Sequence, residues 1–461
     1  MLNSVLSRLA VVMFALVPAH GILAQGDAPG TQASPEKDHI ARMAQIVQSY
    51  ADAHQFMGDV LVARDGQVLF EKSYGYADLE WQVPNSNDSK FRLGSMTKQF
   101  TAASILLLEE RGKLSTDDPV KKYIPDAPAA WDKITIYHLL THTSGIPSFT
   151  GFPDYHASEA KTMTPDQLVA WFKDKPLDFA PGTDWRYSNS GYVLLGYLIE
   201  KISGDTYANF LQKNIFDPLG MKDSGYDSNN AILPYRTSGY TPGPNGPQRA
   251  GYIDMSIPFS AGALYSTTHD LLKWEQGLFG GKVLSAAELK KMTTPFKQDY
   301  ACGLMVTQVN GHTQISHGGG IEGFNTEMAY FADQNLIIIA LGNLNGSAPD
   351  EIVANLGKVA NGQKVVLNSE RKEITVSPDV LAQYVGTYQL APAFSIAITL
   401  ENGGLMAQAT NQPKFPLFAE SPTEFFLKVV DAQVEFFKDD HGKVSYLVLH
   451  QNGHDGKGMK Q

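Results

Sequence analysis

The sequence is short of cysteine, of basic residues and of long apolar segments. Cys302 is the only cysteine, so no internal disulfide can form, and stability has to come from a hydrophobic core, which a chain of 461 residues can supply. Lysine plus arginine number 37 against 48 aspartate plus glutamate, for a formal charge of -11, and no basic cluster occurs. This balance excludes a typical nucleic-acid binder. The lone thiol lies in the strand-like run 300–306 and is interpreted as a buried structural residue rather than a nucleophile.

Residues 1–24 have the features of a secretory signal peptide. Arg8 precedes an apolar stretch at 9–17, and small residues follow at 19, 21 and 24. Pro18 breaks the stretch, which is too short to span a bilayer, so a retained anchor is the less favoured alternative. No other run reaches roughly 18 apolar residues, so we expect a periplasmic or secreted protein with no membrane span after signal cleavage.

Length and composition, with 43% hydrophobic and 18% charged residues, predict a globular chain of two domains. Helical spacing at 40–51 is followed by a hairpin around Asp65-Gly66, and mainly helical signals occupy 101–270. Strand signals then return at 303–309, 312–317, 325–331 and 336–341. The predicted fold is α/β (α+β): an antiparallel sheet, made by the early hairpin and the late strands and flanked by helices, with a helical region inserted between them.

The C-terminal part predicts a second kind of structure. From Pro378 onwards, short β-rich runs alternate with turns such as Glu401-Asn402-Gly403-Gly404, which is typical of a small antiparallel barrel. The predicted domains are therefore a helix-and-sheet unit at 35–365 and a lipocalin-like β-barrel at 375–461. The barrel holds no convincing catalytic set, and we interpret it as an accessory that acts in access or binding.

Ser95 and Lys98 are the first candidates for chemistry. They open the largely apolar run 100–108, and residues i and i+3 share one face of a helix. A serine hydroxyl needs a base within reach to become a nucleophile, and Lys98 can be that base if burial or positive charge lowers its pKa. At a helix start, the Ser95 N–H is free to face a developing oxyanion. The alternative is a capping serine beside a solvated lysine.

Tyr187 and Asn189 follow a turn-rich loop and precede a helical run. Tyr187 can share a proton with Ser95 and Lys98 if nearby positive charge lowers its pKa from about 10. Asn189 can offer its amide to a substrate carbonyl or to Lys98. The alternative is a loop tyrosine followed by an asparagine cap.

His317, Gly318, Gly319 and Gly320 end a predicted strand. Glycines in a strand let a ligand or another backbone approach closely, so a substrate can lie along this edge. The Gly320 N–H is then a second oxyanion donor, and His317 steers an anionic group or the leaving atom. The alternative is a simple bulge.

Together these three motifs, in this order, resemble the serine β-lactamase and penicillin-binding protein superfamily over about residues 45–343. The nearest branches are class C β-lactamases, DD-peptidases, D-aminopeptidases and family VIII esterases. The resemblance implies an exported serine hydrolase with an acyl-enzyme on Ser95, no cofactor and no metal. The implied roles are catalytic for Ser95, Lys98 and Tyr187, substrate-binding for Asn189, His317, Gly318 and Gly319, and oxyanion stabilisation for Ser95 and Gly320.

The third motif departs from class C β-lactamases, which usually have Lys-Thr-Gly where this chain has His317-Gly318-Gly319. Histidine there is more typical of the peptidase and esterase branches. We expect weaker, pH-dependent carboxylate recognition, because an unperturbed histidine titrates near about pH 6.5. The expected substrates are small esters or peptide amides, with D-amino-acid peptides as the preferred amides. The alternatives are a class C-like β-lactamase and a penicillin- or peptidoglycan-binding protein without turnover; the oligomeric state stays open.

His138 and His142 stand four positions apart and offer a metal-dependent alternative. A metalloprotease would have a glutamate where this chain has Leu139, and no third ligand is evident. We therefore interpret both histidines as groups that satisfy the backbone and pack near the site.

Overall fold

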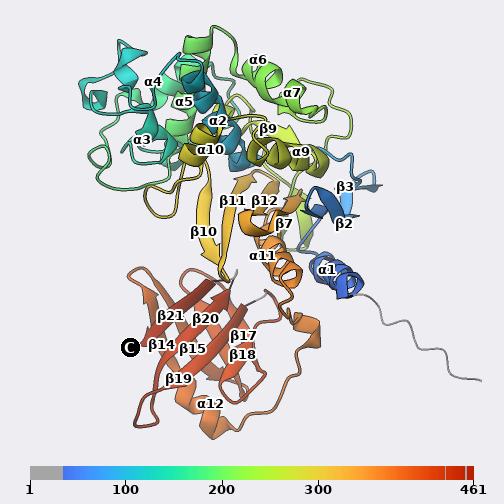
Figure 1. Ribbon diagram of the computed structural model, residues 1–461. Coiled ribbons are helices and arrows are strands. Elements are labelled where there is room, and N and C mark those ends of the chain that lie inside the picture. The colour runs from blue at the N-terminus through green and yellow to red at the C-terminus, as the bar shows by residue number, and fades with distance from the viewer. Residues whose placement is uncertain (1–34, 431, 452–453) are drawn as a thin grey trace, which may run out of the picture.

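The computed structural model describes residues 35–430, 432–451 and 454–461, so the predicted signal peptide at 1–24 lies outside the described residues. Figure 1 shows a larger body of helices around a sheet and, below it, a barrel made by the C-terminal part of the chain. The predicted fold class is confirmed.

Six antiparallel strands form the main sheet. They are β1 Gly58–Arg64, β2 Gln67–Tyr74, β10 Met305–Val309, β11 His312–Ile321, β12 Phe324–Phe331 and β13 Leu336–Gly342. Their spatial order is β10-β11-β12-β13-β1-β2, so the early hairpin joins the late strands as predicted. Every residue of β13 is buried, which agrees with its place in the middle of a sheet covered on both faces.

Local chemistry explains the pairing of β1 with its two neighbours. Asp65 and Gly66 both have positive φ, the conformation that a tight hairpin turn between twisted strands requires. On the other side, β1 pairs with β13 from Arg64 opposite Leu336 to Gly58 opposite Gly342. The register therefore brings the first and last strands of the domain together along their whole length.

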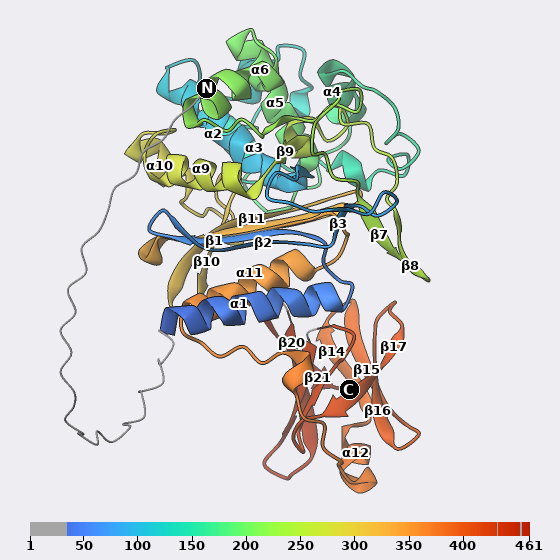
Figure 2. The same cartoon turned by 90° about the vertical axis from the view of Figure 1, so that its right-hand side faces the viewer.

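Helices cover both faces of the sheet, as Figure 2 shows with the sheet seen edge-on. Helices α1 Pro35–Asp52 and α11 Ala348–Ala360 pack on one face. The inserted region supplies the helices on the other face: α2 Thr97–Glu110, α3 Ile136–Leu140, α4 Pro165–Lys173, α5 Asn189–Ser203, α6 Tyr207–Leu211, α7 Asp217–Leu219, α8 Phe259–Gly262, α9 Thr268–Phe279 and α10 Ala286–Met292. Short strands connect them: β3 Tyr76–Asp78, β4 Val83–Pro84, β5 Phe91–Arg92, β6 Gly225–Tyr226, β7 Tyr240–Gly243, β8 Gly246–Arg249 and β9 Leu264–Ser266.

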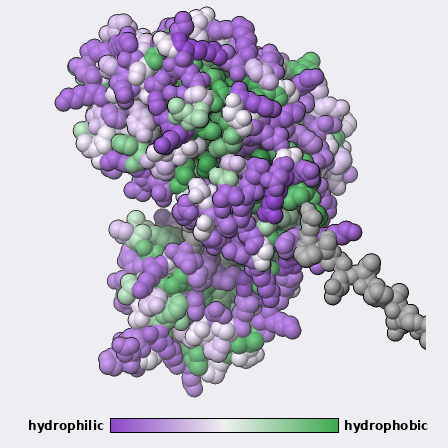
Figure 3. Space-filling view, in the orientation of Figure 1, coloured by the Kyte–Doolittle hydropathy of each residue, from purple (hydrophilic) through white to green (hydrophobic). Residues whose placement is uncertain are grey.

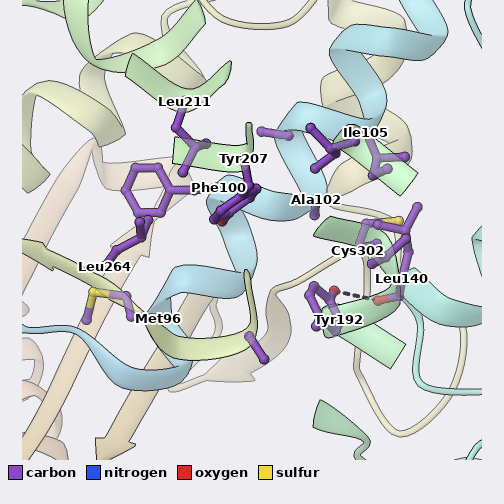
Figure 4. Close-up of a cluster of buried hydrophobic side chains, with 14 of the residues drawn as sticks. Met96, Phe100, Ala102, Ile105, Leu140, Tyr192, Tyr207, Leu211, Leu264 and Cys302 are labelled. Atoms are coloured by element: carbon purple, nitrogen blue, oxygen red, sulfur yellow. Dashed lines mark hydrogen bonds between the residues drawn. The ribbon is translucent and has the colours of Figure 1, made fainter. Parts of the chain in front are cut away.

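Helix α2 is the centre of the larger core. Its residues from Thr97 to Leu108 are all buried, so it is covered on every side rather than along one stripe. Figure 4 shows Phe100, Ala102 and Ile105 among side chains from several other helices, and the hydroxyl of Tyr192 donates a hydrogen bond of 2.7 Å to the carbonyl of Leu140. Burial of each large apolar side chain stabilises the fold by about 1.5–3 kcal/mol. The first turn of α2 is therefore held on a rigid support.

Helix boundaries follow the capping signals. Thr164 and Gln167 form a capping box at the start of α4. The side chain of Ser188 caps the start of α5. Gly204 ends α5 in the left-handed conformation, which glycine adopts without strain.

The C-terminal strands form a closed eight-stranded barrel, which confirms the predicted barrel. The strands are β14 Gly386–Ala391, β15 Phe394–Glu401, β16 Gly404–Ala409, β17 Lys414–Ala419, β18 Glu424–Phe426, β19 Ala432–Lys438, β20 Val444–Gln451 and β21 His454–Lys460. Helix α12 Pro378–Tyr384 precedes them, and the first strand begins at Gly386. Tyr384, Tyr388 and Phe436 pack in the barrel core.

The barrel contacts the larger body near the end of α1. The side-chain amide of Gln55 donates a hydrogen bond of 2.7 Å to the carbonyl of Val429. Figure 3 shows a mainly hydrophilic face with a narrow waist between the two bodies.

Within the described ranges, no helix has the length and apolar character needed to cross a membrane.

Candidate active site

Ser95 lies in a short 3₁₀ turn, η1 Gly94–Met96, that leads directly into α2. The helix was expected to start at the serine, but α2 begins at Thr97. The tighter turn still brings the two predicted residues together, with Lys98 Nζ 3.0 Å from Ser95 Oγ. Ser95 is partly exposed, whereas Lys98 is fully buried, so the alternative of a solvated lysine is wrong.

Lys98 Nζ has two further neighbours, Asn189 Oδ1 and the carbonyl oxygen of Ala261, each at 2.8 Å. Burial lowers the pKa of Lys98 well below its usual value. A neutral amine has two N–H groups and one lone pair. Because both carbonyl oxygens can only accept, they take the two N–H groups, and the lone pair faces the hydroxyl of Ser95. The geometry thus favours a base directed at the serine.

Tyr187 lies over this pair, with Lys98 Nζ 4.7 Å from the centre of its ring. Burial raises the pKa of Tyr187, and a hydrogen bond with Ser95 opposes this shift. The condition for sharing a proton with Ser95 and Lys98, a pKa lowered by positive charge, is therefore not met. Burial outweighs the charge, because Lys98 is itself desolvated towards its neutral form. The phenol keeps its proton and can act as a donor near Ser95.

Asn189 starts α5, and its amide is held at both ends. Its Oδ1 accepts from Lys98, while its Nδ2 donates to Thr150 Oγ1 at 3.2 Å. Its backbone N–H donates to Ser148 Oγ at 3.1 Å. Of the two predicted uses of this amide, the structure shows the contact with Lys98. The loop 148–150, which sequence reasoning missed, sets the orientation.

The glycine motif lies inside β11, which continues to Ile321, four residues beyond the predicted end of the strand at His317. Pairing with β12 runs without a break from Gln314 to Ile321, so the alternative of a bulge is wrong. A Cβ atom on Gly319 would lie 1.9 Å from the carbonyl oxygen of Leu93, directly before η1. Gly319 is thus explained by the close approach of β11 to the turn that carries Ser95.

The close approach of β11 also brings the N–H of Gly320, the second predicted oxyanion donor, next to the turn that carries Ser95. Gly94 has a φ of 55°, and a Cβ atom there would lie 2.9 Å from the nitrogen of Gly320. Strand β10 pairs with β11 only as far as Ser316, so β10 does not cover the edge that contains Gly320. The structure therefore places Ser95 and Gly320 side by side at one strand edge.

The ring of His317 is held by two groups of the protein. It is buried, its Nδ1 lies 2.6 Å from the carbonyl oxygen of Gly318, and its Nε2 lies 3.1 Å from the hydroxyl of Tyr300. The carbonyl can only accept, so Nδ1 carries the proton and the tyrosine hydroxyl donates to Nε2. Burial, with a smaller effect of Lys98, lowers the pKa of His317 to about 4. The expectation of a titration near pH 6.5 is wrong, and a direct contact of His317 with substrate has no support in this geometry.

His142 packs behind the site and does not form a pair of ligands with His138. Its Nδ1 accepts a hydrogen bond of 3.1 Å from the backbone of Ser188, and its ring lies 4.3 Å from that of Tyr187. His138 instead accepts from the backbone of Thr135 at the start of α3. Among the residues that the structure describes, no group of three or more potential ligands is placed to hold a metal ion.

A cavity of about 100 Å³ opens above Ser95. Its lining consists of Gly94, Ser95, Phe149, Thr150, Tyr155, Asn189, Ile253, Pro258, Ala261, Gly262, Gly320, Ile321 and Glu322. The wall combines apolar and aromatic side chains with polar groups, and Glu322 is the one charged residue in this lining. Sequence reasoning missed Glu322 and Tyr155, because neither belongs to a motif with a fixed spacing.

Comparison with known proteins agrees with this geometry. The family model described as Beta-lactamase matches residues 43–360, and a domain of unknown function, DUF3471, matches residues 370–460. The chain belongs to the β-lactamase family. The predicted membership of the serine β-lactamase and penicillin-binding protein superfamily is thus confirmed, and the chain is a serine hydrolase of this family.

Relatives cover nearly all of the chain. Penicillin-binding protein 4* of Bacillus subtilis (strain 168) is 30% identical over 442 residues, which make up 90% of this chain and 97% of that protein. A penicillin-binding protein from Bacillus halodurans is similar in structure, with a TM-score of 0.61, 27% identity, and 68% of this chain and 98% of that chain covered. A D-stereospecific amidohydrolase from Streptomyces sp. has a TM-score of 0.60, 28% identity, and 70% and 98% coverage.

Proposed function

We propose that this β-lactamase family protein is an exported hydrolase that cleaves amide or ester bonds through an acyl-enzyme on Ser95. The arrangement of Lys98 carries this proposal. Its two N–H groups are directed at Asn189 and Ala261, and its lone pair at the serine. Such a base is what a neutral serine hydroxyl needs in order to attack a carbonyl group.

The proposed reaction uses only groups of this chain and water. The Ser95 proton moves to Lys98 Nζ as Oγ bonds to the substrate carbonyl carbon, and the carbonyl oxygen becomes an oxyanion. The N–H groups of Ser95 and Gly320 stabilise that charge. The tetrahedral intermediate then expels the leaving amine or alcohol, which takes a proton from Lys98 through the Tyr187 hydroxyl. Water repeats the sequence on the acyl-enzyme and releases the acid.

Small esters and peptide amides are the proposed substrates, with amides of D-amino acids preferred. Two observations support this choice over cephalosporins. His317 is held neutral by burial, so the third motif has no cation for a β-lactam carboxylate. In addition, one similar structure is that of a D-stereospecific amidohydrolase. We further propose that the barrel tunes access to the site and that the mature protein is periplasmic or secreted.

A panel of substrates tests this proposal. We expect kcat/KM for p-nitrophenyl esters and D-alanyl amides to exceed that for nitrocefin, with no loss of activity in chelator. If nitrocefin is faster by about tenfold, a gap of roughly 1.4 kcal/mol in transition-state stabilisation, the protein is a β-lactamase instead. A burst of product followed by no turnover identifies a binding protein that stays acylated.

A further inference from the structure

Glu322 is a charged residue in an otherwise uncharged cavity wall. It follows β11 directly, two positions beyond Gly320, and lines the same cavity as Ser95. Its Oε2 is buried and receives no hydrogen bond from any residue in the described part of the chain. A buried carboxylate oxygen without a donor is costly, and a ligand that supplies an N–H group removes that cost.

The basic side chains nearest to Glu322 have other carboxylate partners. Burial raises the pKa of Glu322; a contact with its own backbone N–H lowers it, Glu159 raises it, and Arg92 and His156 lower it. Arg92 is already paired with Asp227, its Nε lying 2.8 Å from Oδ2. His156 contacts Glu159, with Nδ1 2.8 Å from Oε1. Arg92 and His156 thus each have a carboxylate partner other than Glu322.

We propose that Glu322 selects substrates with a protonated amine next to the scissile carbonyl, that is, amides and peptides with a free α-amino group. This inference rests on the proposed function, because it assumes that Ser95 attacks that carbonyl. It assigns the protein to enzymes that remove N-terminal residues, rather than to those that recognise a C-terminal carboxylate.

Glu322 lies close enough for its carboxylate to reach an amine beside the bound carbonyl. It is the first residue of the two-residue turn between β11 and β12, and two residues of extended chain span at most about 7 Å, so Glu322 begins within about 7 Å of the N–H of Gly320, which binds the carbonyl oxygen. In an amino-acid amide, a single carbon atom separates the amine from that carbonyl. A glutamate side chain bridges the remaining distance. The ammonium then forms a charge-assisted hydrogen bond with Oε2, which favours the ionised carboxylate.

The remaining walls fit the side chain of such a substrate. Phe149, Tyr155, Ile253 and Pro258 line the cavity with aromatic and apolar groups. Glu322 and these walls together select an unblocked amino-acid amide with an apolar or aromatic side chain.

The test compares phenylalanine p-nitroanilide with its N-acetyl derivative, for each enantiomer, on the full-length protein. We expect the wild type to favour the unblocked form in kcat/KM by about ten- to hundredfold, the range of one hydrogen bond to a charged group. In Glu322→Gln this ratio falls to near one. The matched control is Glu159→Gln, which removes a neighbouring carboxylate outside the cavity lining and keeps the wild-type ratio.

Titration of Ser95 with a fluorophosphonate counts the active sites in each preparation. Each kcat/KM is then given per active site, so a poorly folded variant is not mistaken for one with altered specificity. The inference is overturned if the wild type shows no preference for the free amine, or if Glu322→Gln keeps the full preference. A fluorophosphonate that does not label wild-type Ser95 overturns the proposed function, and the inference with it.

Discussion

Replacing Asn189 by aspartate tests the role of Lys98 without a change in shape. Asn189 Oδ1 lies 2.8 Å from Lys98 Nζ, and aspartate puts a negatively charged oxygen in the same place. The charged form of Lys98 gains a partner, so the pKa of Lys98 rises. A protonated amine has no lone pair for the Ser95 proton. We therefore expect Asn189→Asp to need a higher pH than the wild type for the same activity.

The size of the effect follows from the distance. Two unit charges 2.8 Å apart attract by about 6 kcal/mol at an effective dielectric constant of about 20. Asn189 is partly exposed, and halving this energy for solvent screening leaves about 3 kcal/mol, or about two pKa units. The acidic limb of the kcat/KM profile should move up by about two pH units. At a fixed pH on that limb, the rate should fall about a hundredfold.

The assay is a pH profile of kcat/KM for an uncharged p-nitrophenyl ester, with active sites counted by titration. Thr150→Val is the control, since it removes the partner of Asn189 Nδ2 and adds no charge near Lys98. We expect Thr150→Val to lose some activity, while the acidic limb of its kcat/KM profile stays at the same pH as in the wild type. If the limb stays in place in Asn189→Asp as well, or if activity falls equally at every pH, Lys98 is not the base.

Three further predictions concern the support of the site. Gly319→Ala should abolish activity and lower the free energy of unfolding by more than about 2 kcal/mol in urea titration, because the added Cβ overlaps the backbone oxygen of Leu93. The control Gly151→Ala has open space around its Cβ and should change neither activity nor stability by much. A protein truncated after residue 361 and still folded by circular dichroism should acylate a small ester; loss of acylation would mean that the barrel takes part in the chemistry. Burial and Asp350 raise the pKa of Glu327, so folding stability should fall as pH rises above the pKa that this glutamate has in the unfolded chain. Urea titrations at pH 5 and pH 8 should therefore show a smaller fall in stability for Glu327→Gln than for the wild type. An equal fall in both proteins would contradict a raised pKa for Glu327.

The sequence contained enough local information for most of the fold. Hairpin chemistry at Asp65-Gly66, capping residues at Thr164 and Gly204, and the apolar run of β13 each depend on neighbours in the chain. Two strands of the barrel have sequences that do not predict a strand. Strand β17 contains Pro416, and β21 contains Gly456 and Gly458, so neither has the composition of a typical strand.

The spacing of Ser95 and Lys98 is visible in the sequence, but the electrostatics of the candidate site are not. The pKa values of Tyr187 and His317 depend on burial by residues far along the chain, so neither direction could be read from the motifs. The carbonyl of Ala261, 163 positions from Lys98, could not be found from any motif.

The most direct test of the account is to trap the covalent intermediate during turnover. The wild type is mixed with an excess of a p-nitrophenyl ester, quenched in acid within one turnover and examined by intact-mass spectrometry and peptide mapping. We predict one added acyl group on Ser95, its loss in Ser95→Ala, and slow formation in Lys98→Met. An acyl group on another residue, or turnover in Ser95→Ala at the wild-type rate, would contradict the account.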